Sequence, residues 1–335
     1  MSGVFLELSG SWGSWGRRGP GTVDSAMQAS LVFLFGAGVS CEDEVREILD
    51  KSRARKKKSG QSLSRLDERP ENMRVGVLGA GGRMGREVCL AVTQAADMEL
   101  AAAVDPGIDV GEVCGAPILP DLAAILEKEV DAIVDFTNPD AVMGNLAWCL
   151  QHGIHLVVGT SGFTEERFTQ VQELVGMGPP NVIVAPNFAI GAVLMAHLSE
   201  IAAPSFERVE VIEFHHDGKA DAPSGTALNT AARLNAVRRK TGGWPQRGES
   251  EELLAGARGC SIEDVRVHAV RLPGLVAHQE VIFGGQGQTL TIRHDSVDRT
   301  SFMPGVLLAL RNVMKRPGIT IGLEPLLGLS KDWSE

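Results

Sequence analysis

From residue 73 to residue 185 the chain repeats one pattern, in which a short apolar run is followed by a segment with helical periodicity. Repeated β–α units of this length predict an α/β fold with a Rossmann-type, doubly wound parallel sheet. The predicted strands are residues 74–78, 100–104, 132–136, 155–158 and 181–185. The predicted helices between them are residues 86–95, 122–129, 141–152 and 168–175.

The pattern changes after Asn187, where strands become longer and alternate between apolar and polar residues. This style predicts a second, α+β domain with an open mixed sheet. Its expected helices are residues 191–202 and 226–239, and its expected strands are residues 207–215, 265–272, 277–284 and 288–294. We therefore divide the chain into a dinucleotide-binding domain at 73–186, a second domain at 187–301, and a C-terminal return to the first domain at 302–330.

Residues 1–72 have a different composition, rich in Gly, Ser and Trp at first and then highly charged. Such a segment has little apolar surface to bury, which predicts a largely disordered extension without a catalytic role. The basic run at 53–58 is typical of a solvated segment, with RNA or membrane-surface contact as the alternative. A secretory or lipoprotein signal fits poorly, because Gly36 and Gly38 interrupt the apolar run before Cys41. Translation from Met73 would remove the extension altogether.

Composition and charge exclude several functions for a chain of 335 residues. The formal net charge of −10 argues against a nucleic-acid partner. No stretch reaches the roughly 18 apolar residues of a membrane span. The five cysteines are scattered and form no C-x-x-C pair, so we expect reduced thiols in a cytoplasmic protein, without disulfides or a zinc site.

A glycine-rich loop follows the first predicted strand and precedes the first predicted helix, with the sequence Gly-Ala-Gly-Gly-Arg-Met-Gly at 79–85. Its glycines fit the spacing G-x-x-G-x-x-G. Glycines let a backbone approach a pyrophosphate, and a helix N-terminus offers unpaired N–H groups. The alternative is a strand-turn-helix corner that binds nothing. The predicted cofactor-binding residues here are Gly79, Ala80, Gly81, Gly82, Arg83 and Met84.

Asp105 ends the second predicted strand, twenty residues after Gly85. An acidic residue at this place can accept the ribose hydroxyls of NADH and repels the 2′-phosphate of NADPH. NADH is therefore the favoured cofactor, although Arg83 softens this preference. The alternative is a turn residue before Pro106.

Two further loops follow predicted strand ends, where ligands bind in open α/β sheets. They contain small, hydroxyl-bearing and glycine residues suited to a nicotinamide ribose and carboxamide, although each alone is also typical of an ordinary turn. The candidate residues in these loops are Phe136, Thr137, Gly159, Thr160 and Ser161.

The strongest signal is the segment Glu-Phe-His-His-Asp-Gly-Lys-Ala-Asp-Ala-Pro-Ser-Gly-Thr at 213–226, which joins a predicted strand to a predicted helix. N–H groups at the helix start, with the Thr226 hydroxyl, can hold a carboxylate. His215, His216 and Lys219 add proton donors and positive charge, which suits an anionic substrate that needs protonation.

More ordinary explanations cover only parts of this segment. A satisfied surface histidine and a helix N-cap at residues 224–226 would each explain a few residues. A metal pair is disfavoured because adjacent strand residues point to opposite faces, and no third histidine or cysteine completes a set. We therefore expect no metal.

The same segment resembles the signature of the dihydrodipicolinate reductases. The glycine loop, residues 135–137, residues 159–162 and residues 185–188 resemble that family's cofactor segments in the same order, and the resemblance spans residues 73 to about 329. It implies an NADH- or NADPH-dependent reduction of a small cyclic dicarboxylate in the diaminopimelate route of lysine biosynthesis. One departure is Ser161, where many relatives have threonine.

The resemblance also implies roles for individual residues. His215 and Lys219 match proton-donating positions, and His216, Ser224, Gly225 and Thr226 match substrate-binding positions. Ala185, Pro186, Asn187 and Phe188 match cofactor-binding positions. The second domain would bind substrate and assemble a homotetramer through its sheet.

Two rivals stay open. Another two-domain dehydrogenase, of the aspartate semialdehyde or homoserine type, would leave the His-His-Lys pattern unexplained, and no cysteine lies in a loop suited to the semialdehyde chemistry. A dinucleotide-sensing regulatory protein would not need Lys219 and two histidines beside an anion site.

Overall fold

The structure is a computed structural model, which describes residues 72–108, 111–160, 163–176, 179–245 and 251–329. All of these residues belong to one compact unit, Pro70–Glu335. The predicted extension at 1–72 lies outside the described residues, apart from its last position, and so does Ser161. Within the described parts of the chain, no helix is long and apolar enough to cross a membrane.

The first part of the unit is built on an eight-stranded sheet with the order β13-β7-β6-β5-β1-β2-β4-β3. All neighbouring strands run parallel except β3 and β4, which pair antiparallel. The strands are β1 (Met73–Leu78), β2 (Met98–Val104), β3 (Glu112–Val113), β4 (Ala116–Leu119), β5 (Ala132–Asp135), β6 (His155–Val158), β7 (Val182–Val184) and β13 (Ile319–Ile321).

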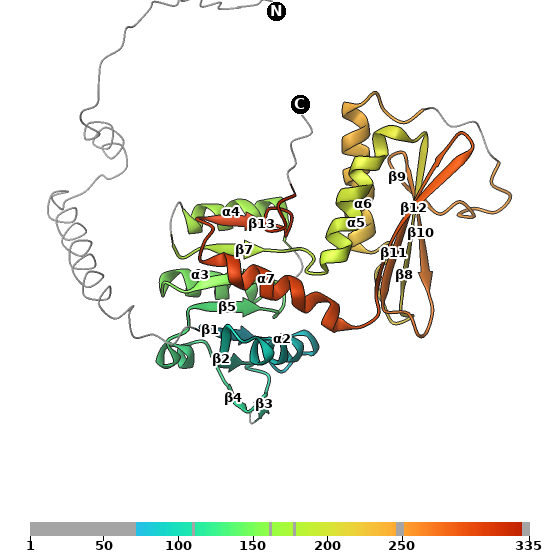
Figure 1. The fold of residues 1–335 in the computed structure, drawn as a ribbon. Helices are drawn as coiled ribbons and strands as arrows, with labels where there is room; N and C mark the ends of the chain where they lie inside the picture. Colours follow the sequence, from blue (N-terminus) through green and yellow to red (C-terminus); the bar gives the residue numbers. More distant parts are fainter. Residues whose placement is uncertain (1–71, 109–110, 161–162, 177–178, 246–250, 330–335) are drawn as a thin grey trace, which may run out of the picture. The chain divides into compact units, whose positions relative to one another are not determined.

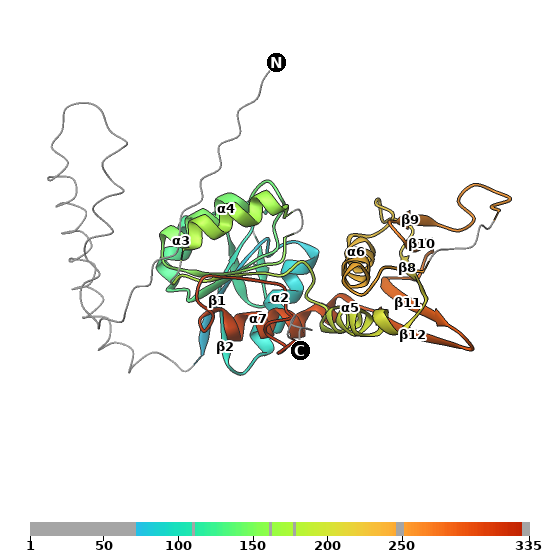
Figure 2. The same cartoon turned by 90° about the horizontal axis from the view of Figure 1, so that it is seen from above.

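Helices cover both faces of this sheet, as the repeated β–α pattern predicts (Figures 1 and 2). Helices α2 (Arg83–Gln94) and α7 (Met303–Val313) pack on one face, around Val75 and Val77 of β1. Helices α3 (Val142–Gln151) and α4 (Glu165–Val175) pack on the other face. The doubly wound α/β fold is therefore confirmed.

One predicted helix is not an α-helix. Residues 122–129 were predicted to be helical, and the helix found there, η2 (Ala123–Lys128), is a 3₁₀ helix. The segment is short, and Glu129 ends it in the left-handed region with φ of 49°, so no further α-helical turn follows. The two-residue strand β3 and the short strand β4 were not predicted, because neither has an alternating pattern long enough to be recognised.

The second sheet has five strands in the order β12-β11-β8-β10-β9, with β8 and β10 parallel and the other neighbours antiparallel. The strands are β8 (Arg208–His215), β9 (Cys260–Ile262), β10 (Val265–Arg271), β11 (Ala277–Gly285) and β12 (Gln288–Ser296). Helices α5 (Ile190–Ala202) and α6 (Gly225–Lys240) lie along one face of this sheet (Figure 1). Together they form an open mixed sheet of the predicted kind.

The core of this second sheet joins alternate residues of its central strands to the two helices. Val211 of β8 and Phe283 of β11 are fully buried beside Leu234 of α6 and Met195 of α5. This alternation of buried and half-buried residues explains why the long strands were recognisable from sequence.

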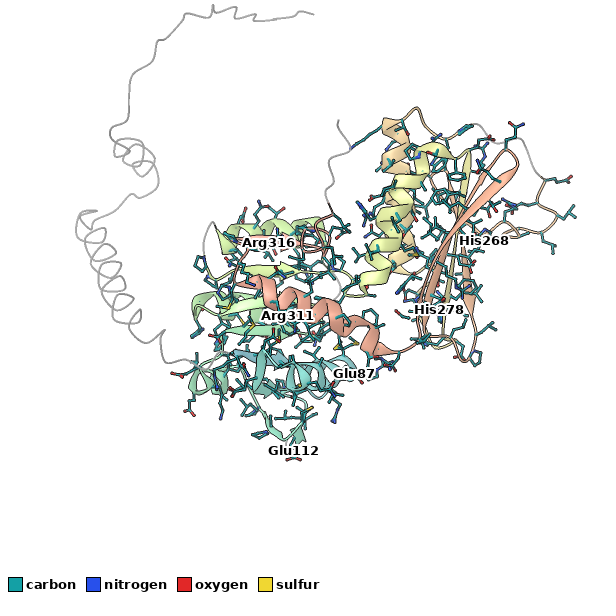
Figure 3. All side chains as sticks on the ribbon, viewed as in Figure 1. Glu87, Glu112, His268, His278, Arg311 and Arg316 are labelled. Atoms are coloured by element: carbon teal, nitrogen blue, oxygen red, sulfur yellow. The ribbon has the colours of Figure 1, made fainter. Side chains whose placement is uncertain are left out.

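After the second sheet the chain returns to the first. A 3₁₀ turn, η4 (Arg299–Phe302), leads into α7, and β13 then pairs in parallel with β7 at the edge of the eight-stranded sheet. Arg311 of α7, labelled in Figure 3, forms a bidentate ion pair with Asp97, the residue before β2. The two hydrogen bonds of this pair are 2.7 and 2.9 Å long. The C-terminal segment is thus a structural part of the first sheet.

Candidate active site

A cavity of about 500 Å³ lies where the carboxyl ends of the parallel strands meet residues of the second sheet. Fourteen of the predicted site residues line it: Gly82, Arg83, Met84, Phe136, Thr137, Gly159, Thr160, Ala185, Pro186, Asn187, Phe188, His215, Ser224 and Thr226. The cavity thus joins the cofactor candidates to part of the segment at 213–226.

The glycine loop has the geometry that its spacing predicts. Gly79 has φ of +73°, and a Cβ there would lie 2.7 Å from the Phe136 carbonyl oxygen, so only glycine fits this turn. Gly85 packs on the Gly79 carbonyl, where a Cβ would lie 2.0 Å from the oxygen. Gly82 is the N-cap of α2 and has no side chain to cap the helix. The N-terminus of α2, with its unpaired N–H groups, therefore faces the cavity without a side chain in the way.

Asp105 lies behind the glycine loop and is not among the residues that line the cavity. Its Oδ2 accepts a hydrogen bond from the Gly81 N–H at 3.0 Å, and its Oδ1 accepts one from the Gly107 N–H at 3.0 Å. The carboxylate therefore supports the loop, a role that sequence reasoning did not foresee. Each oxygen keeps a second lone pair for a ribose hydroxyl.

Asp135 is a fully buried carboxylate that ties the two remaining cofactor loops together. Its Oδ1 accepts hydrogen bonds from the Thr137 N–H at 2.8 Å, the Thr137 hydroxyl at 2.6 Å and the Thr160 hydroxyl at 2.9 Å. Its Oδ2 accepts one from the Asn145 amide at 2.8 Å. The loops after β5 and β6 thus share one anchor, which explains how Thr137 and Thr160 come to line the same cavity.

Aromatic rings form one wall of the cavity. The Phe136 and Phe188 rings lie with centroids 5.7 Å apart, and both line the cavity. A Cβ at Gly159 would lie 2.3 Å from the Phe136 ring, so the absence of a side chain at Gly159 is what lets Phe136 occupy this position. The wall offers an apolar surface for a flat ring.

His215 is the last residue of β8, and its Nδ1 lies 2.5 Å from Glu213 Oε2. Because an ionised carboxylate only accepts hydrogen bonds, Nδ1 carries the proton and Nε2 is the nitrogen left for a ligand. Burial lowers the pKa of His215, and this outweighs the raising effect of Glu213, while Lys219 and Arg271 lower it further. Burial alone would raise the pKa of Glu213, but hydrogen bonds from Arg271, His215 and the Ser224 N–H hold it below its usual value.

The start of α6 forms another part of the cavity wall. Ser224 is the N-cap, and its hydroxyl accepts the Ala227 N–H at 3.2 Å. Ser224 is buried and Thr226 is half-buried, and both line the cavity. Gly225 lies between them as the first residue of the helix, and it is exposed. This helix start can hold a carboxylate through its N–H groups and the Thr226 hydroxyl.

Lys219 and His216 do not line the cavity. Lys219 Nζ donates to Asp221 Oδ1 at 2.6 Å, and this hydrogen bond lowers the pKa of Asp221. His216 is exposed on the loop that follows β8. The geometry therefore brings His215, Ser224 and Thr226 together and leaves Lys219 and His216 on the neighbouring loop.

Sequence reasoning missed the cavity residues of β11 and β12, which include His278, Gln279, His294 and Ser296. Gln279 shares the inward face of β11 with the fully buried Val281 and Phe283, so a polar residue on an apolar face was the available signal. Gln279 Nε2 donates to the Thr230 hydroxyl at 2.9 Å. Figure 3 labels His278, whose Nδ1 lies 2.7 Å from Asp295 Oδ1.

The four described cysteines lie away from the cavity. Cys89 and Cys149 are buried, and burial raises the pKa of each thiol to about 12. Neither these two nor the exposed Cys114 and Cys260 line the cavity, which disfavours a semialdehyde dehydrogenase. Within the described ranges, no group of three or more metal-ligating side chains is present.

The parallel sheet and the glycine loop are those of a reductase with a Rossmann-type NAD(P)-binding domain. Family models described as dihydrodipicolinate reductase, N-terminus and C-terminus, match residues 73–188 and 191–327. The chain belongs to the dihydrodipicolinate reductase family.

Individual relatives agree with this assignment. The chain is 54% identical over 258 residues to the 4-hydroxy-tetrahydrodipicolinate reductase of Mycobacterium marinum, covering 77% of this chain and 100% of that protein. It is 52% identical to the Nocardia farcinica protein of the same name, covering 77% of this chain and 99% of that protein. The solved structure of dipicolinate-bound dihydrodipicolinate reductase from Paenisporosarcina sp. TG-14 has 40% identity and a TM-score of 0.67, covering 76% of this chain and 99% of that one.

Proposed function

We propose that the cavity is the place where the chain reduces 4-hydroxy-tetrahydrodipicolinate to tetrahydrodipicolinate, with NAD(P)H as the reductant, in the diaminopimelate route to lysine. The observation that carries this is the meeting, in one cavity, of a glycine-loop helix start with His215 and a second, carboxylate-binding helix start. The relative from Paenisporosarcina was solved with dipicolinate, a planar dicarboxylate, which supports the same substrate class here.

The residues present fit a dinucleotide. Gly82 leaves the start of α2 without a capping side chain, and Gly159 lets the Phe136 ring pack against the loop after β6, where both residues line the cavity. The start of α2 would hold the pyrophosphate, and Thr137, Thr160 and the 185–188 segment would hold the nicotinamide end. When bound, the nicotinamide supplies the hydride.

The overall reaction consumes one hydride and one proton and releases one water, so the protein must deliver a proton. His215 Nε2 is the nitrogen free to donate it, because Nδ1 is held by Glu213. Burial keeps the pKa of His215 low before substrate binds. A substrate with two carboxylates adds negative charge beside the ring and favours the imidazolium, so substrate binding would load the proton that the reaction needs.

Lys219 is proposed as the second proton-donating residue, with Asp221 as its partner in the absence of substrate. A substrate carboxylate would compete with Asp221 for the ammonium, drawing the loop of residues 216–223 towards the cavity. His216, on the same loop, would join Ser224, Gly225 and Thr226 in holding the substrate.

Steady-state kinetics with NADH and 4-hydroxy-tetrahydrodipicolinate test this assignment. General acid catalysis contributes about 10²–10⁴-fold, so His215→Ala and Lys219→Ala should lower kcat by about that factor with NADH affinity unchanged. Thr226→Ala should mainly raise KM, because a carboxylate contact made equally in ground and transition states affects binding more than turnover. Near-normal kcat in both His215→Ala and Lys219→Ala would overturn the proposal.

We further propose that NADH is favoured over NADPH, because Asp105 directly follows β2 and both of its oxygens are able to accept further hydrogen bonds.

A homotetramer formed through the second sheet is proposed as the assembly, and the exposed residues in the first half of β12 support it. Light scattering with size-exclusion chromatography tests it. The four described cysteines are unpaired, which supports a cytoplasmic location, testable by cell fractionation.

A further inference from the structure

Glu213 is a fully buried carboxylate, and the proposed chemistry uses only its hydrogen bond to His215. It accepts two hydrogen bonds from Arg271, at 2.8 Å and 2.7 Å, one from His215 Nδ1 at 2.5 Å, and one from the Ser224 N–H at 3.1 Å. A buried charge is tolerated only when it is paired and hydrogen-bonded, and all of its partners here belong to the site or border it.

The partners of Glu213 come from three different elements. His215 ends β8, and Ser224 caps the start of α6. Arg271 ends β10, and its Nη2 also donates to the Asp221 carbonyl at 2.8 Å. Asp221 in turn holds Lys219 through its side chain. One carboxylate therefore connects the proposed proton donor, the carboxylate-binding helix start and the loop that carries Lys219.

We propose that Glu213 is the positioning residue of this site, holding the His215 ring in the tautomer and orientation in which Nε2 faces the substrate, while Arg271 balances its charge. The proposal rests on the proposed function, since it needs His215 to be the proton donor. Glu213 touches neither substrate nor cofactor in this scheme and acts through His215 and Ser224.

Charge balance explains why a carboxylate beside a histidine needs an arginine as well. An uncompensated Glu213 would stabilise the imidazolium strongly, and His215 would then hold its proton too tightly to release it. Burial opposes that effect most strongly, and Lys219 and Arg271 oppose it further, so the pKa of His215 stays below its usual value. Protonation of His215 then depends on the negative charge that the substrate brings.

Other charged groups lie on the elements near His215. They include His216, Asp217, Lys219 and Asp221 on the following loop, Arg266, His268 and Arg271 on β10, His278 and Glu280 on β11, Arg293, His294 and Asp295 on β12, and Arg83 at the cavity wall. Of these, Lys219 and Arg271 are the ones that lower the pKa of His215.

Two substitutions separate positioning from simple packing, because they change the charge near His215 in opposite directions. Glu213→Gln removes the negative charge and can place an amide N–H group against Nδ1. This favours the neutral ring that carries its proton on Nε2, and it disfavours the imidazolium that donates the proton. Arg271→Gln removes the positive charge and leaves Glu213 in place.

Glu210→Gln is the matched control. Glu210 lies on the same strand and binds His268 Nε2 at 2.8 Å and Arg258, so it has the same kinds of partner. Neither Glu210 nor its partners line the cavity.

The experiment is the pH profile of kcat for the full chain and these three variants, with NADH binding and thermal unfolding measured alongside. kcat declines as pH rises through the pKa of the acid in the substrate complex. Glu213→Gln should lower kcat about 10²-fold or more near neutral pH, with KM changed much less, and should move this decline to lower pH by about 1–2 units. Arg271→Gln should move it to higher pH, and Glu210→Gln should leave it unchanged.

The possible outcomes distinguish a failure of the proposed function from a failure of the positioning role of Glu213. An inactive full chain would overturn the proposed function itself. An active full chain in which Glu213→Gln folds and keeps the normal profile would overturn the positioning role alone, as would shifts of both variants in the same direction. If Glu213→Gln does not fold, Arg271→Gln decides: an upward shift supports the role, and an unchanged profile overturns it.

Discussion

Asp105 makes two hydrogen bonds to backbone N–H groups, and this complicates the usual test of cofactor choice. An alanine at this position would remove the proposed ribose contact and, at the same time, the acceptor for Gly81 and Gly107. Asparagine separates the two effects, because its amide oxygen can still accept one of these N–H groups while the negative charge is lost.

The expected magnitudes follow from the kinds of hydrogen bond involved. A ribose hydroxyl bonded to a carboxylate contributes about 1.5–3 kcal/mol, so Asp105→Asn should raise the Kd of NADH by about 10-fold to about 150-fold. The Kd of NADPH should stay level or fall, because the charge that repels its 2′-phosphate is gone. Asp105→Ala should weaken both cofactors, since Gly81 then loses its acceptor, and a hydrogen bond to a charged group contributes about 1.5–3 kcal/mol.

Fluorescence titration of the two cofactors against each variant measures these constants directly. Glu112→Gln, labelled in Figure 3 on β3, removes one charge from an exposed residue of the same sheet and serves as the control for net charge. If Asp105→Asn bound NADH as tightly as the parent chain, Asp105 would be a loop-supporting residue only, and the proposed preference for NADH would lose its physical basis.

Three further predictions concern stability and the extension. Gly305→Ala should destabilise the chain by about 1–3 kcal/mol or more, because its Cβ would lie 2.1 Å from the Phe188 carbonyl oxygen. Gly144→Ala should stabilise α3 by about 0.5–1 kcal/mol, because a Cβ there would meet no atom within 4 Å. Calorimetry of both variants measures these changes. Burial lowers the pKa of His155, and Asp131 partly offsets this effect. The contribution of the neutral His155 ring to the free energy of unfolding should therefore be fully present above pH 6.5, the ordinary pKa, and should be lost as pH falls from there towards the folded-state pKa. Urea unfolding from about pH 8 to about pH 5 should show this loss, and His155→Asn should flatten it. A chain beginning at Met73 should keep full activity, because β1 starts at Met73 and both family models match within residues 73–327; a folded but largely inactive product would contradict this.

Elements with a long, regular pattern were predictable from the sequence. The buried runs of β1, β5 and β6 and the alternation of β8 and β11 gave strands within two residues of those observed. β9 and β13, with three residues each, are too short to show a period. β13 also depends on a partner, β7, that lies more than a hundred residues earlier in the chain. Local sequence carries no information about such a pairing.

The candidate site also has a part that the sequence predicted and a part that it did not. Glycines and helix starts gave the cofactor loops, because their chemistry is local: Gly79 needs its positive φ whatever surrounds it. The contacts between loops were not predictable. Thr137 and Thr160 are brought together by Asp135, whose neighbours along the chain suggested only a turn. Asp105 was expected to face a ribose, and its bonds to Gly81 and Gly107 became visible only once the turn was folded.

Buried polar residues on otherwise apolar strand faces are the signal that would have extended the sequence-based site. Glu213 follows Val209 and Val211 on the inward face of β8, and Gln279 precedes Val281 and Phe283 on the inward face of β11. Burying either side chain costs free energy unless something inside the fold pairs with it. Glu213 accepts hydrogen bonds from Arg271 of β10, His215 and Ser224. Gln279 Nε2 donates to Thr230 of α6, whereas its buried Oε1 has no hydrogen-bond partner among the described residues. A polar residue that interrupts an apolar strand face therefore indicated the framework of the site, beyond the residues that the motif itself names.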